Sequence, residues 1–209
     1  MKTLAILGSG HLGQQIAHYA LADSHYDKVV FFDDFSTETQ ANGYAILGGS
    51  DAVEAEFQKR SFDELLIGIG YKHLAARKQL FERFEGKIPF GKIIHSSSWV
   101  DATAQIKSGC IIYPSCCIDA NAVIHENTIL NLACTIAHDT QVGRHCFLSP
   151  RVALAGFVTV GEMCILGINS TVIDNISIVA GSQTGGGTVV IDTILKSGLY
   201  VGNPQRFVR

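Results

Sequence analysis

His138 and Asp139 are neighbouring side chains whose types suit acid–base chemistry. An imidazole can take a proton from an incoming nucleophile near neutral pH, because its charge changes in that range. A carboxylate beside it can orient the ring or stabilise the charge that the ring acquires. His138 is therefore a candidate general base, although an outward-facing histidine on a soluble protein is by itself a common feature without catalytic meaning.

A glycine-rich turn near the start is a second candidate. Residues 8–13 read Gly-Ser-Gly-His-Leu-Gly, directly after a predicted strand and at the start of a predicted helix. Glycines let the backbone approach a phosphate, and the N–H groups of a helix start bind its charge. Asp33 ends the next predicted strand, where its carboxylate could accept a hydrogen bond from a ribose or base. The pattern predicts a nucleotide site and favours a mononucleotide moiety over NAD, because the domain is about half a dinucleotide fold.

Glycines also recur in the second half, at Gly156, Gly167, Gly185-Gly186-Gly187 and Gly202-Asn203-Pro204. In turns, glycine usually meets a backbone requirement. Some of these positions could also let a long ligand lie flat on the protein, or leave an N–H free to bind an oxyanion.

The predicted secondary structure and the frequency of charged residues both change along the chain. Short runs of Val, Ile, Leu and Phe predict buried strands at residues 2–7, 28–33 and 65–69. Apolar residues at helical spacing predict helices at 11–22, 51–59 and 72–84. Strands that alternate with helices predict a parallel sheet, here about half of a doubly wound fold. Charged residues are frequent in this part and sparse after it, so we expect one domain over residues 1–94 and another over 95–209.

The second part repeats every six residues. From Val100 to Val190, fifteen of the sixteen residues at this spacing are Ile, Leu or Val, and the exception is Thr184. A second column, four places after each of these, is mostly small. Neither a helix nor an ordinary strand has this period, whereas a parallel β-helix does, with three short faces in each coil. Both columns should point inward, and His138, two places after Ile136, should point outward.

Five of the six cysteines belong to the small inward column: Cys110, Cys116, Cys134, Cys146 and Cys164. Cys116 and Cys134 are one coil apart and should be neighbours, as should Cys146 and Cys164. We expect free core thiols, which behave as small hydrophobic side chains, over the alternatives of a disulfide or zinc site. Cys117 lies outside the column and should be the most exposed.

Composition excludes several classes of function. A net charge of −3 over 209 residues argues against a nucleic-acid binder with a broad basic face. No run approaches the ~18 apolar residues of a membrane span. The first residues faintly mimic a signal peptide, but glycines and polar residues interrupt them. We expect a mature, soluble, cytoplasmic protein.

Taken together, the motifs resemble those of the bacterial nucleotide-sugar acyltransferases of the sialic-acid and bacillosamine pathways. The resemblance covers nearly the whole chain and rests on Gly8-Ser9-Gly10-His11, Phe32-Asp33-Asp34-Phe35, Ile67-Gly68-Ile69-Gly70, Ile94-His95, residues 131–139, Leu166-Gly167-Ile168-Asn169-Ser170, Gly185-Gly186-Gly187 and Val201-Gly202-Asn203-Pro204. It implies a small Rossmann-like domain followed by a left-handed parallel β-helix. It also implies a homotrimer with acetyl-CoA as co-substrate, bound between adjacent β-helices, and no metal.

The resemblance also implies roles for individual residues. His138 matches the catalytic base, Asp139 the acidic residue that follows it, and Gly156 a glycine whose N–H contacts the acetyl group. The remaining acetyl-CoA-binding positions are Gly167, Gly185, Gly186, Gly202 and Pro204. The nucleotide-sugar pocket is matched by Gly8, Gly10, His11, Asp33, Asp34 and Gly70.

Two departures from the family pattern affect these expectations. A second histidine, which some members have nine positions after the catalytic one, is Phe147 here, and His145 is nearby but out of register. This puts the contacts to the acetyl group in doubt, but not the base. Tyr71-Lys72 replaces a polar pair often found after the third strand, so the preferred base or sugar can differ.

The mechanism that these residues predict is direct acyl transfer from acetyl-CoA to the amino group of a nucleotide-linked 4-amino-4,6-dideoxy sugar. Acetylation of a sugar hydroxyl would use the same base and remains an alternative. A third possibility is a metalloenzyme resembling the γ-class carbonic anhydrases, with His125, His138 and His145 as zinc ligands. A fourth is a nucleotide-sugar-binding protein without catalysis. The sequence leaves open the choice among UDP, dTDP and GDP, the sugar and the acyl chain length.

Overall fold

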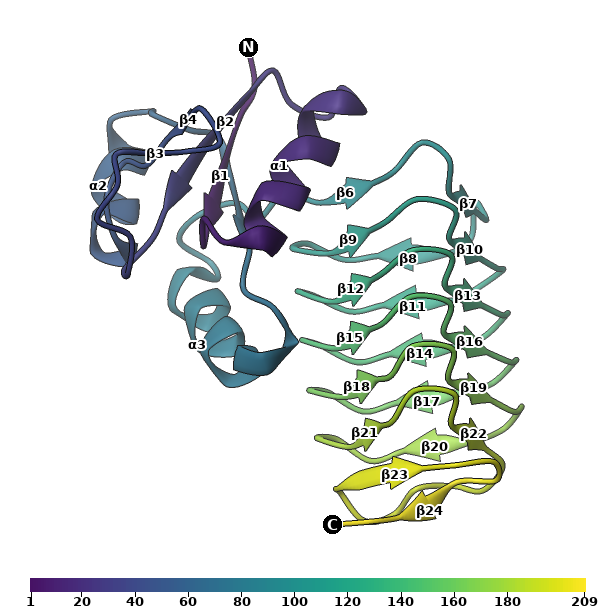
Figure 1. The fold of residues 1–209 in the computed structure, drawn as a ribbon. Helices are drawn as coiled ribbons and strands as arrows, with labels where there is room; N and C mark the ends of the chain where they lie inside the picture. Colours follow the sequence, from purple (N-terminus) through teal and green to yellow (C-terminus); the bar gives the residue numbers. More distant parts are fainter. The chain divides into compact units, whose positions relative to one another are not determined.

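The computed structural model describes residues 1–209, and the chain divides into two units, Met1–Ile93 and Ile94–Arg209. In the first unit, three parallel strands form a sheet in the order β2-β1-β5, with β1 at Thr3–Leu7, β2 at Lys28–Phe32 and β5 at Glu64–Ile67 (Figure 1). This confirms the predicted parallel sheet. The third strand ends two residues earlier than predicted, because Gly68 and Ile69 turn away to line a cavity.

Helices cover both faces of this sheet. Helix α1 (His11–Ala22) buries Ile16, Ala17 and Ala20 and contacts β1 and β2. Helices α2 (Val53–Gln58) and α3 (Leu74–Phe84) pack on the opposite face, where Val53, Phe81 and Phe84 join the core. Each follows a single 3₁₀ turn, at Ser50–Ala52 and Tyr71–His73, so both α-helices begin two residues later than predicted. No helix of the chain has the length and apolar composition needed to cross a bilayer.

A short hairpin, β3 (Gln40–Ala41) and β4 (Tyr44–Ala45), was not predicted. Its turn is Asn42-Gly43, and both residues have positive φ, 50° and 82°. Asn-Gly between short strands is a strong hairpin signal, because both residues tolerate the left-handed region.

The second unit is a parallel β-helix with three sheets, as the period of six predicts (Figure 1). The first sheet contains β7 (Trp99–Val100), β10 (Cys117–Ile118), β13 (Thr135–Ile136), β16 (Ala153–Leu154), β19 (Thr171–Val172) and β22 (Val189–Val190). The second contains β8 (Gln105–Ile106), β11 (Val123–Ile124), β14 (Gln141–Val142), β17 (Thr159–Val160) and β20 (Ser177–Ile178). The third contains β6 (Ile93–Ile94), β9 (Ile111–Ile112), β12 (Ile129–Leu130), β15 (Phe147–Leu148), β18 (Ile165–Leu166), β21 (Gln183–Thr184), β23 (Leu199–Val201) and the antiparallel β24 (Arg206–Phe207).

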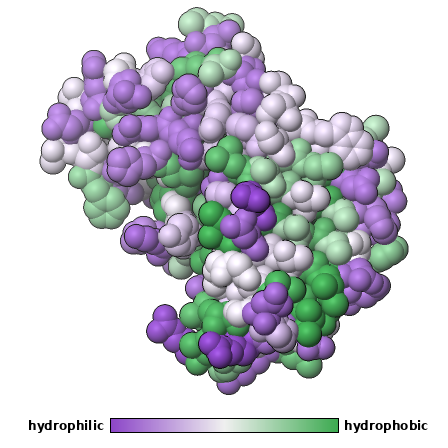
Figure 2. All heavy atoms as spheres, turned by 45° about the vertical axis from the view of Figure 1, so that its right-hand side comes forward, coloured by the Kyte–Doolittle hydropathy of each residue, from purple (hydrophilic) through white to green (hydrophobic).

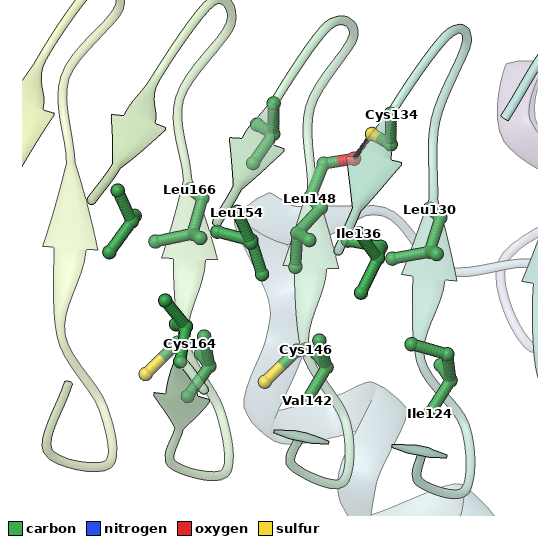
Figure 3. Packing of buried hydrophobic residues seen from close by; sticks show 14 of the residues in the cluster. Ile124, Leu130, Cys134, Ile136, Val142, Cys146, Leu148, Leu154, Cys164 and Leu166 are labelled. Atoms are coloured by element: carbon green, nitrogen blue, oxygen red, sulfur yellow. Dashed lines mark hydrogen bonds between the residues drawn. The ribbon is translucent and has the colours of Figure 1, made fainter. Parts of the chain in front are cut away.

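The aliphatic column fills the interior of the coils (Figure 3). Residues 18 apart pair in register, for example Ile118 with Ile136 and Ile136 with Leu154. The exception in this column, Thr184, is also buried, and its hydroxyl bonds to the Gly167 N–H (2.9 Å) and to the Ser170 hydroxyl (2.7 Å). The single polar side chain of the column is therefore satisfied inside the core.

Thiols and hydroxyls of the small column hydrogen-bond from one coil to the next. The Sγ of Cys134 approaches the carbonyls of Leu148 (3.9 Å, dashed in Figure 3) and Ser149 (3.3 Å). Cys146 donates to the Gly161 carbonyl at 3.1 Å, and Thr128 donates to the Gly143 carbonyl at 2.8 Å. Ser149, Gly161 and Gly143 belong to turns of the following coil, and Leu148 ends the strand before such a turn.

The expected state of the cysteines is confirmed. All six are free, the five of the column are buried, and Cys117 is the one with intermediate exposure. Burial and the neighbouring Cys164 thiol raise the pKa of Cys146 well above its usual value. The buried thiol therefore stays protonated and can donate its hydrogen bond.

Candidate active site

A cavity of about 600 Å³ lies at the carboxyl ends of β1, β2 and β5 in the first unit. Its volume is within the usual range for small-molecule sites. The six predicted nucleotide-sugar positions all line it: Gly8, Gly10, His11, Asp33, Asp34 and Gly70. Residues from three separate loops therefore meet in one cavity.

Gly8 and Gly13 allow close backbone contacts at this cavity, and Gly10 leaves it open. Gly8 has φ +107°, and a Cβ there would be 3.0 Å from the Gly68 carbonyl oxygen. A Cβ on Gly13 would lie 1.9 Å from the Gly8 oxygen, so α1 could not begin where it does with any side chain at that position. Gly10 is different, because a Cβ there would meet nothing within 4 Å. It leaves open the start of α1, where no side chain caps the helix.

The Asp33 carboxylate holds the glycine-rich turn. Its Oδ2 accepts hydrogen bonds from the Ser9 N–H (2.8 Å) and hydroxyl (2.6 Å), and its Oδ1 accepts from the N–H groups of Phe35 (2.9 Å) and Ser36 (3.1 Å). A carboxylate has about four acceptor positions, so these bonds use them before any ligand binds. Partial burial opposes ionisation, but the hydrogen bonds from Ser9, Phe35 and Ser36 prevail and lower the pKa of Asp33 below its usual value.

Several lining residues were not predicted as site residues. Phe35 is 96% exposed and lines the cavity, and so do Lys72, which carries a positive charge, and His73, whose ring offers a hydrogen-bond donor. Lys72 and His73 lie in the 3₁₀ turn that leads into α3, just as His11 begins α1. Their place at the start of the helix after a strand was the signal that could have identified them.

His138 and Asp139 lie in the second unit, in the turn between β13 and β14. The imidazole Nδ1 is 3.0 Å from the Asp139 Oδ2, and the His138 side chain is 49% exposed. Because an ionised carboxylate only accepts hydrogen bonds, Nδ1 must carry the proton. The unprotonated Nε2 is then the basic atom of an outward-facing ring.

Gly156 occupies the position of His138 one coil further along, and it lies against the ring. A Cβ there would be 2.7 Å from Cε1 and 2.8 Å from Nε2 of His138. The Gly156 N–H makes no hydrogen bond within the chain. The edge of Phe157 completes this side of the imidazole, with ring centroids 5.1 Å apart. The pair can thus accept a proton at Nε2 and donate a hydrogen bond from the Gly156 backbone.

The other glycines proposed for acetyl-CoA are not beside His138. Gly167, Gly185 and Gly186 follow strands of the third sheet and lie at the amino end of the first sheet, whereas His138 and Gly156 lie at its carboxyl end. Gly202 follows β23, and its carbonyl accepts from Val189 of the first sheet. Pro204 follows in the turn between β23 and β24. One β-helix therefore presents the two groups at opposite edges of the same sheet.

The three histidines of the metal alternative are not gathered in one chain. His125 and His145 lie in turns between the second and third sheets, and His138 lies between the first and second. His145 is fully buried, with Nδ1 2.9 Å from the Asn127 amide nitrogen. No group of three or more His, Cys, Asp or Glu side chains is arranged to hold a metal ion. Phe147, in place of the second family histidine, is buried on β15.

Comparison with known proteins adds independent evidence on the fold. Residues 3–84 match the family described as the PglD N-terminal domain. No curated protein sequence gives a significant match.

Several solved structures have the same fold over the whole chain. The acetyltransferase domain of PglB from Neisseria gonorrhoeae is 24% identical, with a TM-score of 0.92 and 100% of both chains covered. PerB from Caulobacter crescentus, solved with CoA and GDP-perosamine, is 24% identical, with a TM-score of 0.90, covering 100% of this chain and 98% of PerB. WeeI from Acinetobacter baumannii is 19% identical, with a TM-score of 0.86 and full coverage of both. The resemblance drawn from the sequence is confirmed: residues 3–84 match the PglD N-terminal domain, and the chain has the α/β plus left-handed parallel β-helix fold of these acetyltransferases.

Proposed function

We propose that this protein transfers the acetyl group of acetyl-CoA to the amino group of a nucleotide-linked 4-amino-4,6-dideoxy sugar. The observation that carries the proposal is the arrangement at His138. Its Nδ1 is held by Asp139 at 3.0 Å, and its Nε2 faces Gly156, which has no side chain. A general base beside an open, rigid surface is what attack by an amine on a thioester needs.

His138 Nε2 removes a proton from the attacking amine as the nitrogen adds to the thioester carbonyl. The carbonyl oxygen becomes an oxyanion, which the Gly156 N–H stabilises by a hydrogen bond. Collapse of the tetrahedral intermediate breaks the C–S bond, and the thiolate of CoA takes the proton back from the imidazolium. Asp139 holds the ring and stabilises its positive charge in between. The products are the amide and CoA, and the step requires no metal.

The nucleotide part of the substrate is assigned to the cavity of the first unit. The uncapped start of α1 and Lys72 suit a diphosphate, because helix N–H groups and a cation both favour negative charge. His11 and His73 also line the cavity, and their rings can donate hydrogen bonds to phosphate oxygens. Gly10 leaves space for the phosphates to approach the backbone. The complex of PerB with CoA and GDP-perosamine supports this class of substrate.

A homotrimer would complete the acetyl-CoA site. The proposed contacts lie at both edges of the first sheet, with His138 and Gly156 at one and Gly167, Gly185, Gly186, Gly202 and Pro204 towards the other. Adjacent copies could bring the edge of one β-helix to the opposite edge of the next. Figure 2 shows apolar side chains exposed among polar ones on the β-helix, and Phe157, Ile173 and Ile191 are exposed near the His138 edge. Exposed apolar groups of this kind suit burial by a second copy or by the pantetheine arm.

The reaction would belong to glycan biosynthesis, since nucleotide-linked sugars are activated glycosyl donors. We place it in the cytoplasm, because acetyl-CoA and nucleotide sugars are supplied there.

The test is acetyl transfer from acetyl-CoA to UDP-, dTDP- and GDP-linked 4-amino-4,6-dideoxy sugars, followed by thiol release. We expect turnover with one nucleotide and a fall of about 10²- to 10⁴-fold in His138→Ala, the usual contribution of a general base. His125→Ala is the matched control, because His125 is also partly exposed in a turn of the β-helix. It should keep the wild-type rate.

Two results would overturn the proposal. Transfer that survives in His138→Ala would remove the assigned base. Turnover only with a 4-hydroxy analogue would show that the protein acetylates oxygen, with the same base acting on a hydroxyl.

A further inference from the structure

Asn121 connects the His138–Asp139 pair to the preceding coil. Its Nδ2 donates to the Asp139 Oδ1 at 3.2 Å, while the Asp139 Oδ2 is 3.0 Å from the His138 Nδ1. The two oxygens of one carboxylate are therefore held by two different side chains. We infer that Asn121 is a positioning residue for the reaction proposed above, acting on His138 through Asp139.

The bond from Asn121 belongs to a longer line of hydrogen bonds. Thr103, Asn121 and Asp139 occupy the same turn position in three successive coils, 18 residues apart. The Thr103 hydroxyl donates to the Asp101 carboxylate (2.6 Å) and accepts from the Asn121 N–H (2.8 Å). The backbone of Asn121 is thus held by Thr103 of the preceding coil, and its side-chain amide points to Asp139 of the following coil. The line ends at the imidazole of His138.

This bond determines which nitrogen of His138 is basic. A carboxylate on an exposed turn can rotate about its Cβ–Cγ bond, and each rotation takes an oxygen away from Nδ1. The amide of Asn121 occupies Oδ1 and leaves Oδ2 for the ring. Nδ1 then keeps its proton, and Nε2 stays free beside Gly156.

The bond is not needed to stack the coils. The backbone already joins them here, because the Asp139 N–H donates to the Ala120 carbonyl at 2.9 Å. Asn175, two coils beyond Asp139 at the same turn position, directs its amide to Asp174 of its own turn at 2.7 Å. An asparagine at this position therefore does not bridge coils by default. Asn121 bridges them at the one turn that carries the proposed base.

The test compares two replacements that the backbone accepts. Asn121 has φ +58°, a conformation that glycine adopts freely and that aspartate tolerates. Asn121→Gly deletes the amide without strain, and Asn121→Asp keeps the shape but replaces the donor with a second carboxylate. Ser115→Gly is the control, because Ser115 has φ +63° at an exposed turn that precedes β10, at the opposite edge of the first sheet from Asp139.

We expect kcat to fall about tenfold in Asn121→Gly, with KM for both substrates unchanged, because the ring is misoriented while binding groups are intact. The kcat of Asn121→Asp should fall at least as far, because the new carboxylate would repel the carboxylate of Asp139. In an Asp139→Ala background, Asn121→Gly should have no further effect, because the two act through one interaction. Ser115→Gly should match the wild type. Full additivity with Asp139→Ala would overturn the inference.

A second readout does not depend on turnover. The ¹⁵N chemical shifts of the neutral His138 ring report which nitrogen is protonated. We expect the Nδ1–H form to dominate in the wild type and the Nε2–H form to increase in both Asn121 variants. If the same nitrogen of the His138 ring is protonated in the wild type and in both variants, the positioning role is disproved, whether or not the proposed substrate is the right one. Conversely, a shifted tautomer in a protein that acetylates none of the sugars would leave Asn121 assigned and the proposed function wrong.

Discussion

Gly156 is the residue whose missing side chain does most to shape the candidate site. Ala120, His138 and Asp174 occupy the same turn position in neighbouring coils, so the backbone there accepts a side chain. The reason for glycine is the imidazole, which lies within 2.8 Å of the place where a Cβ would be. The identity of this residue is therefore set by the base and not by the turn.

Gly156→Ala is expected to lower acetyl transfer by tenfold or more while the fold persists. The added methyl group displaces an exposed ring, so the free energy of unfolding should change by less than about 1 kcal/mol. The measurement is kcat together with urea denaturation. A variant that keeps its rate would mean that the ring position beside Gly156 is unimportant.

Asp33 gives the first unit a dependence on pH whose sign follows from its lowered pKa. A carboxyl group whose pKa is lower in the folded state stabilises the fold above its ordinary value of 3.8 and loses that contribution as the pH falls below it. We expect the free energy of unfolding, and nucleotide binding, to fall in this acid range. Asp33→Asn should lose part of this dependence and should bind nucleotide more weakly at neutral pH, because an amide NH₂ would face the Ser9 donors. Identical pH profiles for the two proteins would contradict the assignment.

The sequence located the cavity through residue types that stand beside recognisable turns, while the roles of these residues stay predictions. The six positions predicted for the nucleotide sugar line one cavity, and the neighbours His138 and Asp139 are hydrogen-bonded. Asn121 was not foreseen, because its role depends on a contact between residues 18 apart that also requires a particular side-chain direction. The sequence also did not predict that hydrogen bonds within the protein occupy every acceptor position of Asp33. Ser9 and the turn at 35–36 come together only in the fold.

Among the elements, the small inward column does more than fill the corners of the coils. Most of its thiols and hydroxyls donate to a carbonyl 15 residues ahead, as Cys146 does to Gly161 and Thr128 does to Gly143. The exceptions are Thr188, which donates to the Gly185 carbonyl, and Ser182, whose buried hydroxyl has no hydrogen-bond partner. Hydroxyls of the column also accept from the next coil, as the Cys146 N–H donates to Thr128 Oγ1 at 3.1 Å. Serine, threonine and cysteine are thus interchangeable here in function.

This equivalence predicts the outcome of two replacements at Cys146. Cys146→Ser should change the free energy of unfolding by less than about 1 kcal/mol, because a hydroxyl can make the same bond. Cys146→Ala should cost about 1–2 kcal/mol through the lost bond and a small cavity. Urea denaturation of the three proteins measures both. If serine proves as costly as alanine, the thiol contributes only by its volume.

The strands of the β-helix could be predicted from the six-residue period, whereas the hairpin and the exact starts of two helices could not. The six-residue repeat identified the strands from β7 to β22, because each of these coils must bury the same two columns, whereas β6, β23 and β24 lie outside the predicted repeat. The hairpin at β3 and β4 lies outside any repeat and was missed although Asn42-Gly43 carried the signal. The starts of α2 and α3 were predicted two residues too early, because the sequence does not distinguish the preceding 3₁₀ turn from a first α-helical turn.

At the scale of the whole molecule, the proposed homotrimer predicts an acetyl-CoA site that is shared between two copies of the chain. His138 lies at one edge of the first sheet and Gly186 at the other, so a site shared by neighbours would use one from each. Trimer formation itself was implied by the family and not by any pattern in the residues.

Mixing inactive variants tests this arrangement. Gly186 is exposed, and a side chain there would meet only Ile168 at 3.1 Å, so Gly186→Leu should fold but obstruct acetyl-CoA. We expect His138→Ala and Gly186→Leu to be inactive alone and partly active when co-expressed, because some sites then combine an intact His138 with an intact Gly186. Sedimentation should give three chains per particle. Absence of recovery in the mixed particles would mean that each chain builds its own site.

The antiparallel strand β24 has a consequence for solubility that none of the chemistry requires. A stack of parallel coils resembles a short piece of cross-β fibril, and an open terminal coil would template the next molecule through its free backbone groups. In the third sheet, β24 covers the edge of β23 with the opposite strand direction, so the outermost hydrogen-bonding pattern no longer matches that of another coil. That reversal gives the solenoid an end that cannot polymerise by simple repetition on this sheet.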